Sequence, residues 1–371
     1  MDFIPVNEPL LDGNEKKYVF DCIDSGWISS AGKYVNEFEE KCAAYFQRKY
    51  AVAVSNGTTA LEAAVAALKL EKGSEVILPA FTIISCGNAI IKNGLVPVFV
   101  DADKKTWNMD VNSIEKVITK KTRAIMVVHI YGLPVDMDKI KEIANKYDLY
   151  VIEDAAEAQG LEYKGKKCGS FGDISVMSFF ANKHIATGEG GMVLSDDIEI
   201  IQRARDYGNL FFDKERKYIH TEIGSNFRMT NIQAAIGCAQ LEKIDEHMKK
   251  KQIMAQLYNE LLRDNHYFMK PLEKTDYATN VYWVYGLVIN ENYDIDASEV
   301  MEGLHRRGIG TRHFFCPLNL QPAYQDCDYI EKKHFPVAEM LMKKGFYIPL
   351  GYGINEEQVR YVADVLNEIK F

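Results

Sequence analysis

Short apolar runs alternate with amphipathic stretches between residues 50 and 195, and this alternation limits the possible folds more than any other feature. Several runs are apolar at every position, as expected of strands buried on both faces of a mainly parallel sheet. Strands that alternate with helices of this length form βαβ units with right-handed crossovers. The sequence therefore predicts an α/β fold with strands at residues 50–55, 75–79, 96–101, 123–129, 149–154, 174–180 and 191–195, and helices at 58–70, 85–93, 111–120 and 137–147.

The pattern changes after residue 195. Residues 231–251 and 252–263 predict two long helices, and we expect the lysines at 249–251 to form a solvated helix face. A strand at 282–289 and helices at 297–307 and 356–370 indicate a smaller α+β unit. The chain of 371 residues exceeds the roughly 250–300 at which a single core stops growing. We therefore expect a large domain at residues 1–248, N-terminal segment included, and a small C-terminal domain at 249–371.

The composition argues against several classes of protein. The 44 basic and 53 acidic residues give a net charge of −9, so non-specific binding to nucleic acid or to an anionic membrane is not expected. The first residues lack the basic and apolar segments of a signal peptide, and no apolar run approaches the roughly 20 residues of a spanning helix. Seven scattered cysteines without CxxC spacing are typical of reduced thiols. We therefore expect a cytoplasmic enzyme.

Common cofactor and catalytic motifs are missing from the sequence. The first predicted strand ends in SNGTT rather than GxGxxG, and no P-loop motif occurs. Neither an HExxH metal motif nor a GxSxG nucleophile motif is present, and the eight histidines lie far apart. Dinucleotide binding, a metal site and serine-hydrolase chemistry are therefore not expected.

Three polar features follow predicted strands, at the edge of an α/β sheet where ligands bind. Gly57, Thr58 and Thr59 would hold an anion at a helix N-terminus, although a threonine-capped helix is the simpler explanation for this feature alone. Asp154 ends an apolar strand, where a buried carboxylate needs a cation unless it caps the next segment. Lys183 follows another strand and is either a desolvated nucleophile or an exposed loop lysine. Together, a phosphate cradle, a carboxylate and a lysine meet the requirements of pyridoxal 5′-phosphate (PLP).

Motifs along almost the whole chain resemble those of one known family. They include SNGT at 55–58, EDAAE at 153–157, SFF at 178–180, NK at 182–183, GEGG at 188–191 and RMTN at 228–231. On these residues the sequence is similar to the sugar-nucleotide aminotransferases named after DegT and StrS. The resemblance implies the aspartate-aminotransferase-like (type I PLP) fold for the large domain.

The resemblance also implies roles for individual residues. Lys183 corresponds to the Schiff-base lysine and Asp154 to the partner of the cofactor's ring nitrogen. Ser178, with the turn at Gly57 and Thr58, corresponds to the phosphate-binding residues.

The resemblance also implies roles for Asn226 and Glu157. Asn226 corresponds to a residue that reaches the phosphate of the neighbouring subunit's cofactor, so the resemblance implies a homodimer with shared sites. Glu157 stands beside the cofactor's 3′-oxygen, where many relatives have Gln or His. A carboxylate next to a phenolate repels it unless a proton is shared, so we expect Glu157 to titrate together with the cofactor.

The resemblance implies amination of a nucleotide-linked 4-keto-6-deoxyhexose, with L-glutamate as donor, for polysaccharide biosynthesis. Glu157 favours the subgroup that aminates C4 of GDP-4-keto-6-deoxy-D-mannose. A UDP- or dTDP-linked keto sugar, amination at C3, dehydration, and a catalytically silent binding protein are the alternatives. Dehydratases of the family carry His in place of the Schiff-base lysine, whereas here Lys183 is present and His184 is expected to support the loop.

The part of the site that binds the sugar is less defined. An aromatic residue that stacks on the ring in relatives is replaced by Ile83, and Asn319 stands where relatives usually have His. The candidates for binding the sugar nucleotide are Trp27, Ser29, Arg228, Arg312 and Asn319.

Overall fold

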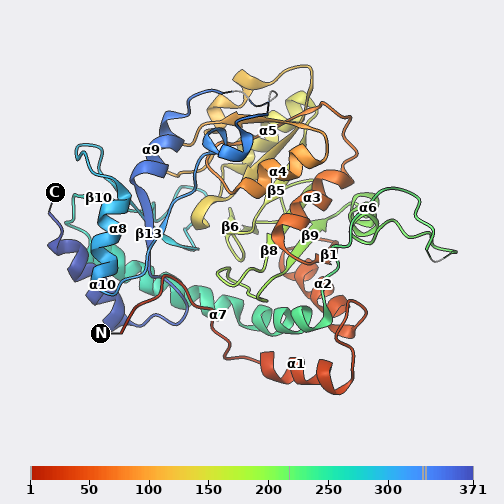
Figure 1. Cartoon of the computed structure of the whole chain (residues 1–371), viewed down its shortest axis with the longest axis horizontal. Helices are drawn as coiled ribbons and strands as arrows, with labels where there is room; N and C mark the ends of the chain where they lie inside the picture. Colours follow the sequence, from red (N-terminus) through yellow and green to blue (C-terminus); the bar gives the residue numbers. More distant parts are fainter. Residues whose placement is uncertain (1, 217, 328–329, 331, 371) are drawn as a thin grey trace.

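A computed structural model describes residues 2–216, 218–327, 330 and 332–370. Its larger part is built on a seven-stranded sheet in the order β1-β9-β8-β5-β4-β2-β3 (Figure 1). Neighbouring strands are parallel, except that β9 is antiparallel to both β1 and β8. The mainly parallel α/β sheet that the alternation predicted is confirmed. The strands are β1 (Tyr50–Val54), β2 (Glu75–Pro79), β3 (Val96–Val100), β4 (Thr122–Val128), β5 (Tyr150–Asp154), β8 (Ile174–Ser178) and β9 (Gly191–Ser195).

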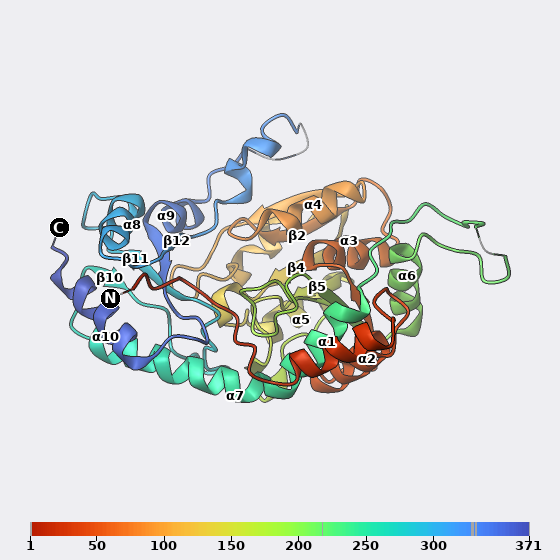
Figure 2. The ribbon, with the colours of Figure 1, turned by 60° about the horizontal axis from the view of Figure 1, so that its bottom comes forward.

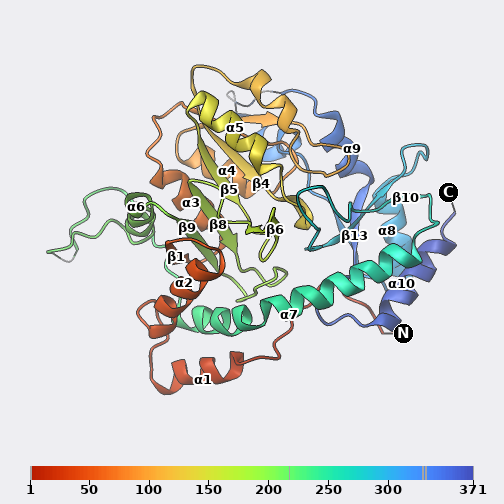
Figure 3. The same ribbon diagram turned by 180° about the vertical axis from the view of Figure 1, so that it is seen from behind.

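Helices cover both faces of this sheet because alternate side chains of each strand point to opposite faces. Val52 and Val54 of β1 pack with the helices of one face, whereas Ala51 and Ala53 belong to the core of the other face. The outermost helix, α1 (Glu15–Asp24), packs on α7 (Figure 3). The remaining helices of this part are α3 (Gly57–Ala67), α4 (Ile84–Lys92) and α6 (Ile198–Gly208) on the first face, and α2 (Lys33–Tyr45), α5 (Met137–Tyr147) and the first half of α7 (Asn231–Leu261) on the second.

Two helix predictions are wrong. Residues 111–120 form only two 3₁₀ turns, Val111–Ser113 and Glu115–Val117, because the segment is rich in β-branched residues and also contains Asn and Ser, all of low helix propensity. Residues 231–263, predicted as two helices, form the single 31-residue helix α7, which begins at a Thr230 capping box and has no breaker near residue 251.

The smaller part has its own antiparallel sheet, in the order β10-β11-β13-β12, and its own core. Helix α7 runs from under the large sheet to this part (Figure 2). Ile4 also lies in this second core and bridges to Ile309, so the N-terminal segment crosses both parts. The proposed division between residues 248 and 249 falls inside α7 and stays a prediction. The elements are β10 (Phe268–Met269), β11 (Tyr285–Ile289), α8 (Ala297–Arg306), β12 (Arg312–His313), α9 (Pro336–Lys344), β13 (Gly345–Ile348) and α10 (Glu356–Glu368), and the large part adds the hairpin β6 (Glu162–Tyr163) and β7 (Lys166–Lys167).

The seven cysteines are all free thiols, and five of them are buried. In the part of the chain that the structure describes, no helix combines the length and the apolar character needed to cross a membrane.

A buried carboxylate at the end of β5 ties the sheet to the loop that follows it. Glu153 is fully buried and accepts hydrogen bonds from His129, Ser175 and the backbone N–H groups of residues 169, 171 and 172. Burial raises the pKa of Glu153, but the His129 hydrogen bond and the backbone donors outweigh burial and lower the pKa to about 2. The hydrogen bonds from this loop therefore stabilise the ionised form of Glu153.

Replacing Glu153 by Gln should destabilise the protein by about 3 kcal/mol at pH 7, since the pKa lies about 2.5 below its ordinary value. Because the folded-state pKa is depressed, this contribution is present above about pH 4.5 and is lost as the pH falls towards 2. Urea unfolding of the wild-type and Glu153→Gln proteins at pH 7 and at about pH 3.5, which lies inside the titration range, tests this prediction. The difference in the free energy of unfolding between the two proteins should be smaller at the lower pH.

A surface variant provides the control for this prediction. Glu302 forms an exposed ion pair with Arg306, so Glu302→Gln should cost less than about 1 kcal/mol at either pH. A Glu153→Gln protein as stable as the Glu302→Gln protein at pH 7 would contradict the account.

Candidate active site

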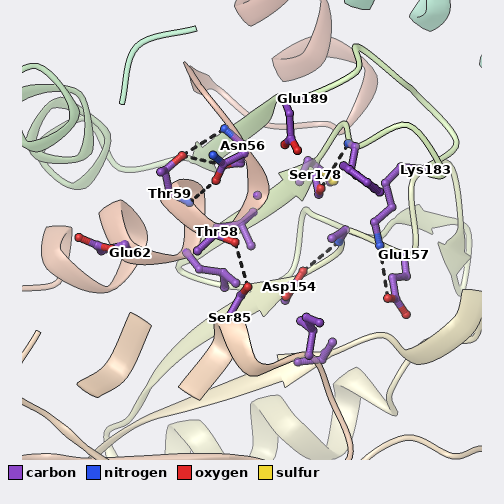
Figure 4. A pocket seen from close by; sticks show the side chains of 18 of the residues that line it. Asn56, Thr58, Thr59, Glu62, Ser85, Asp154, Glu157, Ser178, Lys183 and Glu189 are labelled. Carbon is purple, nitrogen blue, oxygen red and sulfur yellow. Dashed lines mark hydrogen bonds and ion pairs between the residues drawn. The ribbon is translucent and has the colours of Figure 1, made fainter. Parts of the chain in front are cut away.

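A cavity of about 780 Å³ opens at the carboxyl ends of the parallel strands (Figure 4). Its wall combines the N-terminus of α3, the ends of β5 and β8, and the loop after β8, with further residues from the smaller part. The three polar features that the sequence predicted at strand ends all line this cavity. They are the turn at Gly57 and Thr58, the carboxylate of Asp154 and the amine of Lys183.

The first turn of α3 presents both a helix cap and an open anion site. Asn56 caps the helix by accepting a hydrogen bond from the Thr59 backbone N–H at 2.9 Å, and the Thr59 hydroxyl donates back to the Asn56 carbonyl. The helix is therefore capped by Asn56 rather than by a threonine, and Thr59 completes the capping box. Gly57 and Thr58 are left on the cavity side, at the positive end of the helix dipole.

Ser178, at the end of β8, closes the other side of this anion site. A Cβ at Gly57 would lie 2.6 Å from the Ser178 Cβ, so only glycine allows the α3 backbone to approach the serine so closely. The Thr58 and Ser85 hydroxyls lie 2.9 Å apart at the same wall. Backbone N–H groups and three hydroxyls therefore converge where the resemblance places a phosphate.

Asp154 lies in the floor of the cavity and is buried. One carboxylate oxygen accepts the Ala156 N–H at 3.0 Å and the other lies 3.4 Å from the Cys86 thiol. Both interpretations of Asp154 are therefore supported, since it closes a local turn and faces the cavity. Burial raises the pKa of Asp154, although the Ala156 N–H and the Lys183 charge oppose this rise. A protonated ring nitrogen in the cavity would supply the missing positive charge.

Lys183 is not an exposed loop lysine, since its side chain is only 11% exposed. Its Nζ lies 3.3 Å from Glu157 Oε1 (Figure 4). Burial raises the pKa of Glu157 to about 7, although the Lys183 charge and the Tyr131 backbone N–H oppose this rise. The site therefore holds an amine beside a carboxyl group that changes charge near neutral pH.

Sequence reasoning missed several residues of the site. Trp283 lies against Lys183, with Nζ 3.6 Å from the centroid of the indole, although its apolar segment indicated only a buried strand. Phe315 and Tyr347 reach the cavity from the smaller part. Tyr131 has a positive φ of 55°, which marks it as locally strained. Its N–H donates to Glu157 at 3.0 Å.

The expectation for the lysine run was wrong at one position. Lys251 is buried and donates to the Trp283 carbonyl oxygen at 2.7 Å. Burial lowers the pKa of Lys251 to about 7. His184 is also buried, with its Nδ1 2.7 Å from the Tyr352 hydroxyl, which fits the expected support of the loop.

None of the five candidates for binding the sugar nucleotide is among the described residues that line the cavity of this subunit. The Arg228 guanidinium donates to Asn209 Oδ1, and Asn319 donates to the Lys333 carbonyl and to Glu339. The other three side chains are exposed: Trp27, Ser29 and Arg312.

Asn226 and Ile83 also have defined positions. Asn226 is exposed and absent from the described lining of the cavity, although its neighbours Ser225 and Phe227 line it. Ile83 lines the cavity, whereas Phe81 is fully buried and packs against Tyr131 instead. An aliphatic side chain therefore stands where the resemblance expects an aromatic one.

A buried group of metal-ligand type occurs elsewhere, at His129, Glu153 and Cys168. Hydrogen bonds from five donors already occupy the Glu153 oxygens, so this group is a structural cluster.

These residues fit PLP. The anion site suits a phosphate, Asp154 forms no ion pair among the described residues, and Lys183 is a buried amine at the same cavity.

Comparisons with known proteins agree with this fit. The profile of the "DegT/DnrJ/EryC1/StrS aminotransferase family" matches residues 9–367. GDP-perosamine synthase of Escherichia coli O157:H7 is 44% identical over 368 residues, which cover 99% of each chain. The solved structure of Helicobacter pylori PseC, an aminotransferase of pseudoaminic acid biosynthesis, has a TM-score of 0.94 at 27% identity and covers 99% of each chain. The structure of E. coli GDP-4-keto-6-deoxy-D-mannose-3-dehydratase with bound hydrated PLP has a TM-score of 0.92 at 26% identity, over 99% of this chain and 100% of the other.

Replacing Gly57 by Ala should weaken PLP binding at least about 10-fold, because the added methyl group would meet Ser178 at 2.6 Å and close the anion site. A PLP titration followed by absorbance measures the effect. Gly303→Ala in α8 is the matched control, since a Cβ there meets nothing within 4 Å. Equal PLP affinity in the two variants would show that the close approach of α3 to Ser178 is not part of the phosphate site.

Proposed function

The chain belongs to the DegT/DnrJ/EryC1/StrS aminotransferase family, and we propose on this premise that it makes GDP-perosamine by aminating C4 of GDP-4-keto-6-deoxy-D-mannose. It is a PLP-dependent sugar-nucleotide aminotransferase. We further propose L-glutamate as the amino donor and polysaccharide biosynthesis as the role of the product. The observation that carries the proposal is a single cavity in which Lys183 faces Glu157 and lies with Asp154, in a chain 44% identical to a GDP-perosamine synthase over its length.

When bound, PLP supplies a carbon that carries the amino group and a ring that takes up electrons from a broken C–H bond. We propose that Gly57, Thr58 and Ser178 bind its phosphate through backbone N–H groups and hydroxyls. Asp154 would hold a proton on the ring nitrogen, since a buried carboxylate of raised pKa is stabilised in its ionised form by a cation beside it.

Proton movement is assigned to Lys183. Its Nζ would take the proton from the carbon of the amino donor in one half of the reaction and deliver a proton to C4 of the sugar in the other. Glu157 lies 3.3 Å from Nζ. Because its pKa is raised to about 7, both its neutral and its ionised form occur near neutral pH. The small part of the chain, through Phe315 and Tyr347, would exclude water from these steps.

A homodimer with shared sites is part of the proposal. Two groups of apolar side chains are exposed in the single chain: Phe20, Ile23 and Trp27 on α1 and the turn after it, and Tyr218 and Ile223 on the arm that follows α6. The arm projects away from the large part (Figure 2), and Ile223 on it is 96% exposed. Such surfaces are typical of an interface.

Asn226 lies at the base of the same arm, outside the described lining of its own cavity. This placement supports its assignment to the phosphate of a second subunit's cofactor. The substrate candidates outside the cavity, such as Trp27 and Arg228, would likewise complete the partner's site. We place the protein in the cytoplasm, which suits its seven free cysteines.

The substrate assignment is tested by mass spectrometry of the product formed from GDP-4-keto-6-deoxy-D-mannose, L-glutamate and PLP. The amino sugar is expected, and Lys183→Ala should form it at a rate lower by roughly 10²–10⁴-fold, because the proton-transfer group is lost. UDP- and dTDP-linked 4-keto-6-deoxy sugars serve as controls. An amino sugar formed only from these, or a deoxygenated product in place of the amino sugar, would contradict the assignment.

Shared sites predict that two inactive variants complement each other. A mixture of Lys183→Ala and Asn226→Ala subunits should regain about a quarter of the wild-type activity at limiting PLP, because half of the dimers are mixed and each of these has one intact site. If Asn226 acts within its own subunit, mixing restores nothing. Assays before and after subunit exchange distinguish the two outcomes.

A further inference from the structure

Trp283 is a second close neighbour of the Lys183 amine, besides Glu157. Nζ is 3.6 Å from the centroid of the indole and 3.3 Å from Glu157 Oε1. Trp283 lies just before β11 of the smaller part, 100 positions after Lys183 in the chain. It is buried and lines the cavity. The amine is therefore enclosed between a carboxyl group of the large part and an aromatic face of the small part.

One hydrogen bond fixes the indole of Trp283 and another fixes its backbone. Its Nε1 donates to the Asn182 carbonyl at 2.8 Å, directly before Lys183. The Trp283 carbonyl accepts from the buried Lys251 amine of α7 at 2.7 Å.

A close backbone contact holds the same residue from a third side. Gly132 has a φ of +97°, and a Cβ there would lie 2.6 Å from the Trp283 backbone nitrogen. The ring is therefore a fixed surface rather than a mobile side chain.

The ring distinguishes between the two protonation states of the amine. An ammonium group over an indole face is attracted by the ring quadrupole, and a neutral amine is not. A separation of 3.6 Å is well inside the roughly 6 Å range of this interaction. Two other charged groups act on the same amine by Coulomb interaction: Asp154 favours the ammonium, and Lys251 opposes it.

We propose that Trp283 is a positioning residue that stabilises the ammonium form of Lys183 once the lysine, detached from the cofactor, has accepted a proton. The inference rests on the proposed function, in which the donor's nitrogen replaces Lys183 on the cofactor and the lysine leaves as a free amine. When the C–H bond of the donor breaks, its proton would form a new N–H bond at Nζ and its electron pair would pass to the cofactor. The indole face and Glu157 would then stabilise the ammonium group formed at Nζ.

The test measures the protonation of Lys183 directly, in protein reconstituted with pyridoxamine 5′-phosphate so that the lysine is free. Cyanate carbamylates only neutral amines, and mass spectrometry of the peptide that contains Lys183 gives the rate. Trp283→Leu removes the ring and should speed carbamylation about 3–10-fold near neutral pH, because the ammonium is no longer stabilised. Trp283→Phe keeps a weaker ring and should speed it about 1.5–3-fold.

The pH dependence separates this role from simple opening of the site. If the ring acts on charge, the ratio of variant to wild-type rates falls towards 1 as the pH rises and both amines become neutral. If the substitution only admits cyanate, the ratio is the same at every pH. Trp107→Leu is the control, since Trp107 is a buried tryptophan that packs on Phe314 and Tyr131 and makes no contact with Lys183 in the described structure.

Two results overturn the inference: equal carbamylation rates in wild type and Trp283→Leu, or a ratio that does not change with pH. Failure of the proposed function has a different signature, because the product assay with GDP-4-keto-6-deoxy-D-mannose would then yield no amino sugar whatever the carbamylation rates are. Since Trp283→Phe preserves most of the side-chain volume, it keeps the test decisive if Trp283→Leu does not fold.

Discussion

The end of β5 places two carboxylates next to each other in the interior, and the rest of the site depends on how each is neutralised. Strand geometry sends neighbouring side chains to opposite faces of the sheet. On one face, hydrogen bonds from five donors satisfy Glu153 and hold the loop after it. On the other face, Asp154 has one backbone donor and one thiol near it and forms no ion pair among the described residues, although the more distant Lys183 charge acts on it. A buried charge without a cationic partner is costly, so this face is completed only by a positively charged ligand.

The cavity around Asp154 is assembled by elements that are distant in sequence. The α3 N-terminus and β8 supply the anion site, and the loop after β8 supplies Lys183. Trp283 and Tyr347 arrive from the smaller part, which α7 and the N-terminal segment connect to the large sheet. The amine is therefore set between the two parts of the chain. Movement of one part against the other would change the environment of Lys183 as well as access to the cavity.

Sequence reasoning predicted what is local. The alternation of apolar and amphipathic segments predicted the strands. Because the carboxyl ends of parallel strands share one edge of the sheet, it also predicted that Gly57, Asp154 and Lys183 lie together. Long-range contacts were not predictable in the same way. Trp283 looked like an ordinary core residue, and Lys251 looked like part of a solvated lysine run. Both acquire their roles only when α7 and the small sheet pack against the loop after β8. Likewise, no residue near position 251 marks whether α7 ends or continues, so its full length was not apparent.

The central claim is that this cavity binds PLP with Lys183 as the amine that bonds to it. Borohydride reduction of the PLP-loaded protein, followed by digestion and mass spectrometry, tests the claim most directly because reduction fixes the cofactor on the lysine that holds it. The account predicts a phosphopyridoxyl group on the peptide that contains Lys183. A label on Lys251 or on any other lysine in its place, or no label on a protein that has taken up PLP, would contradict it.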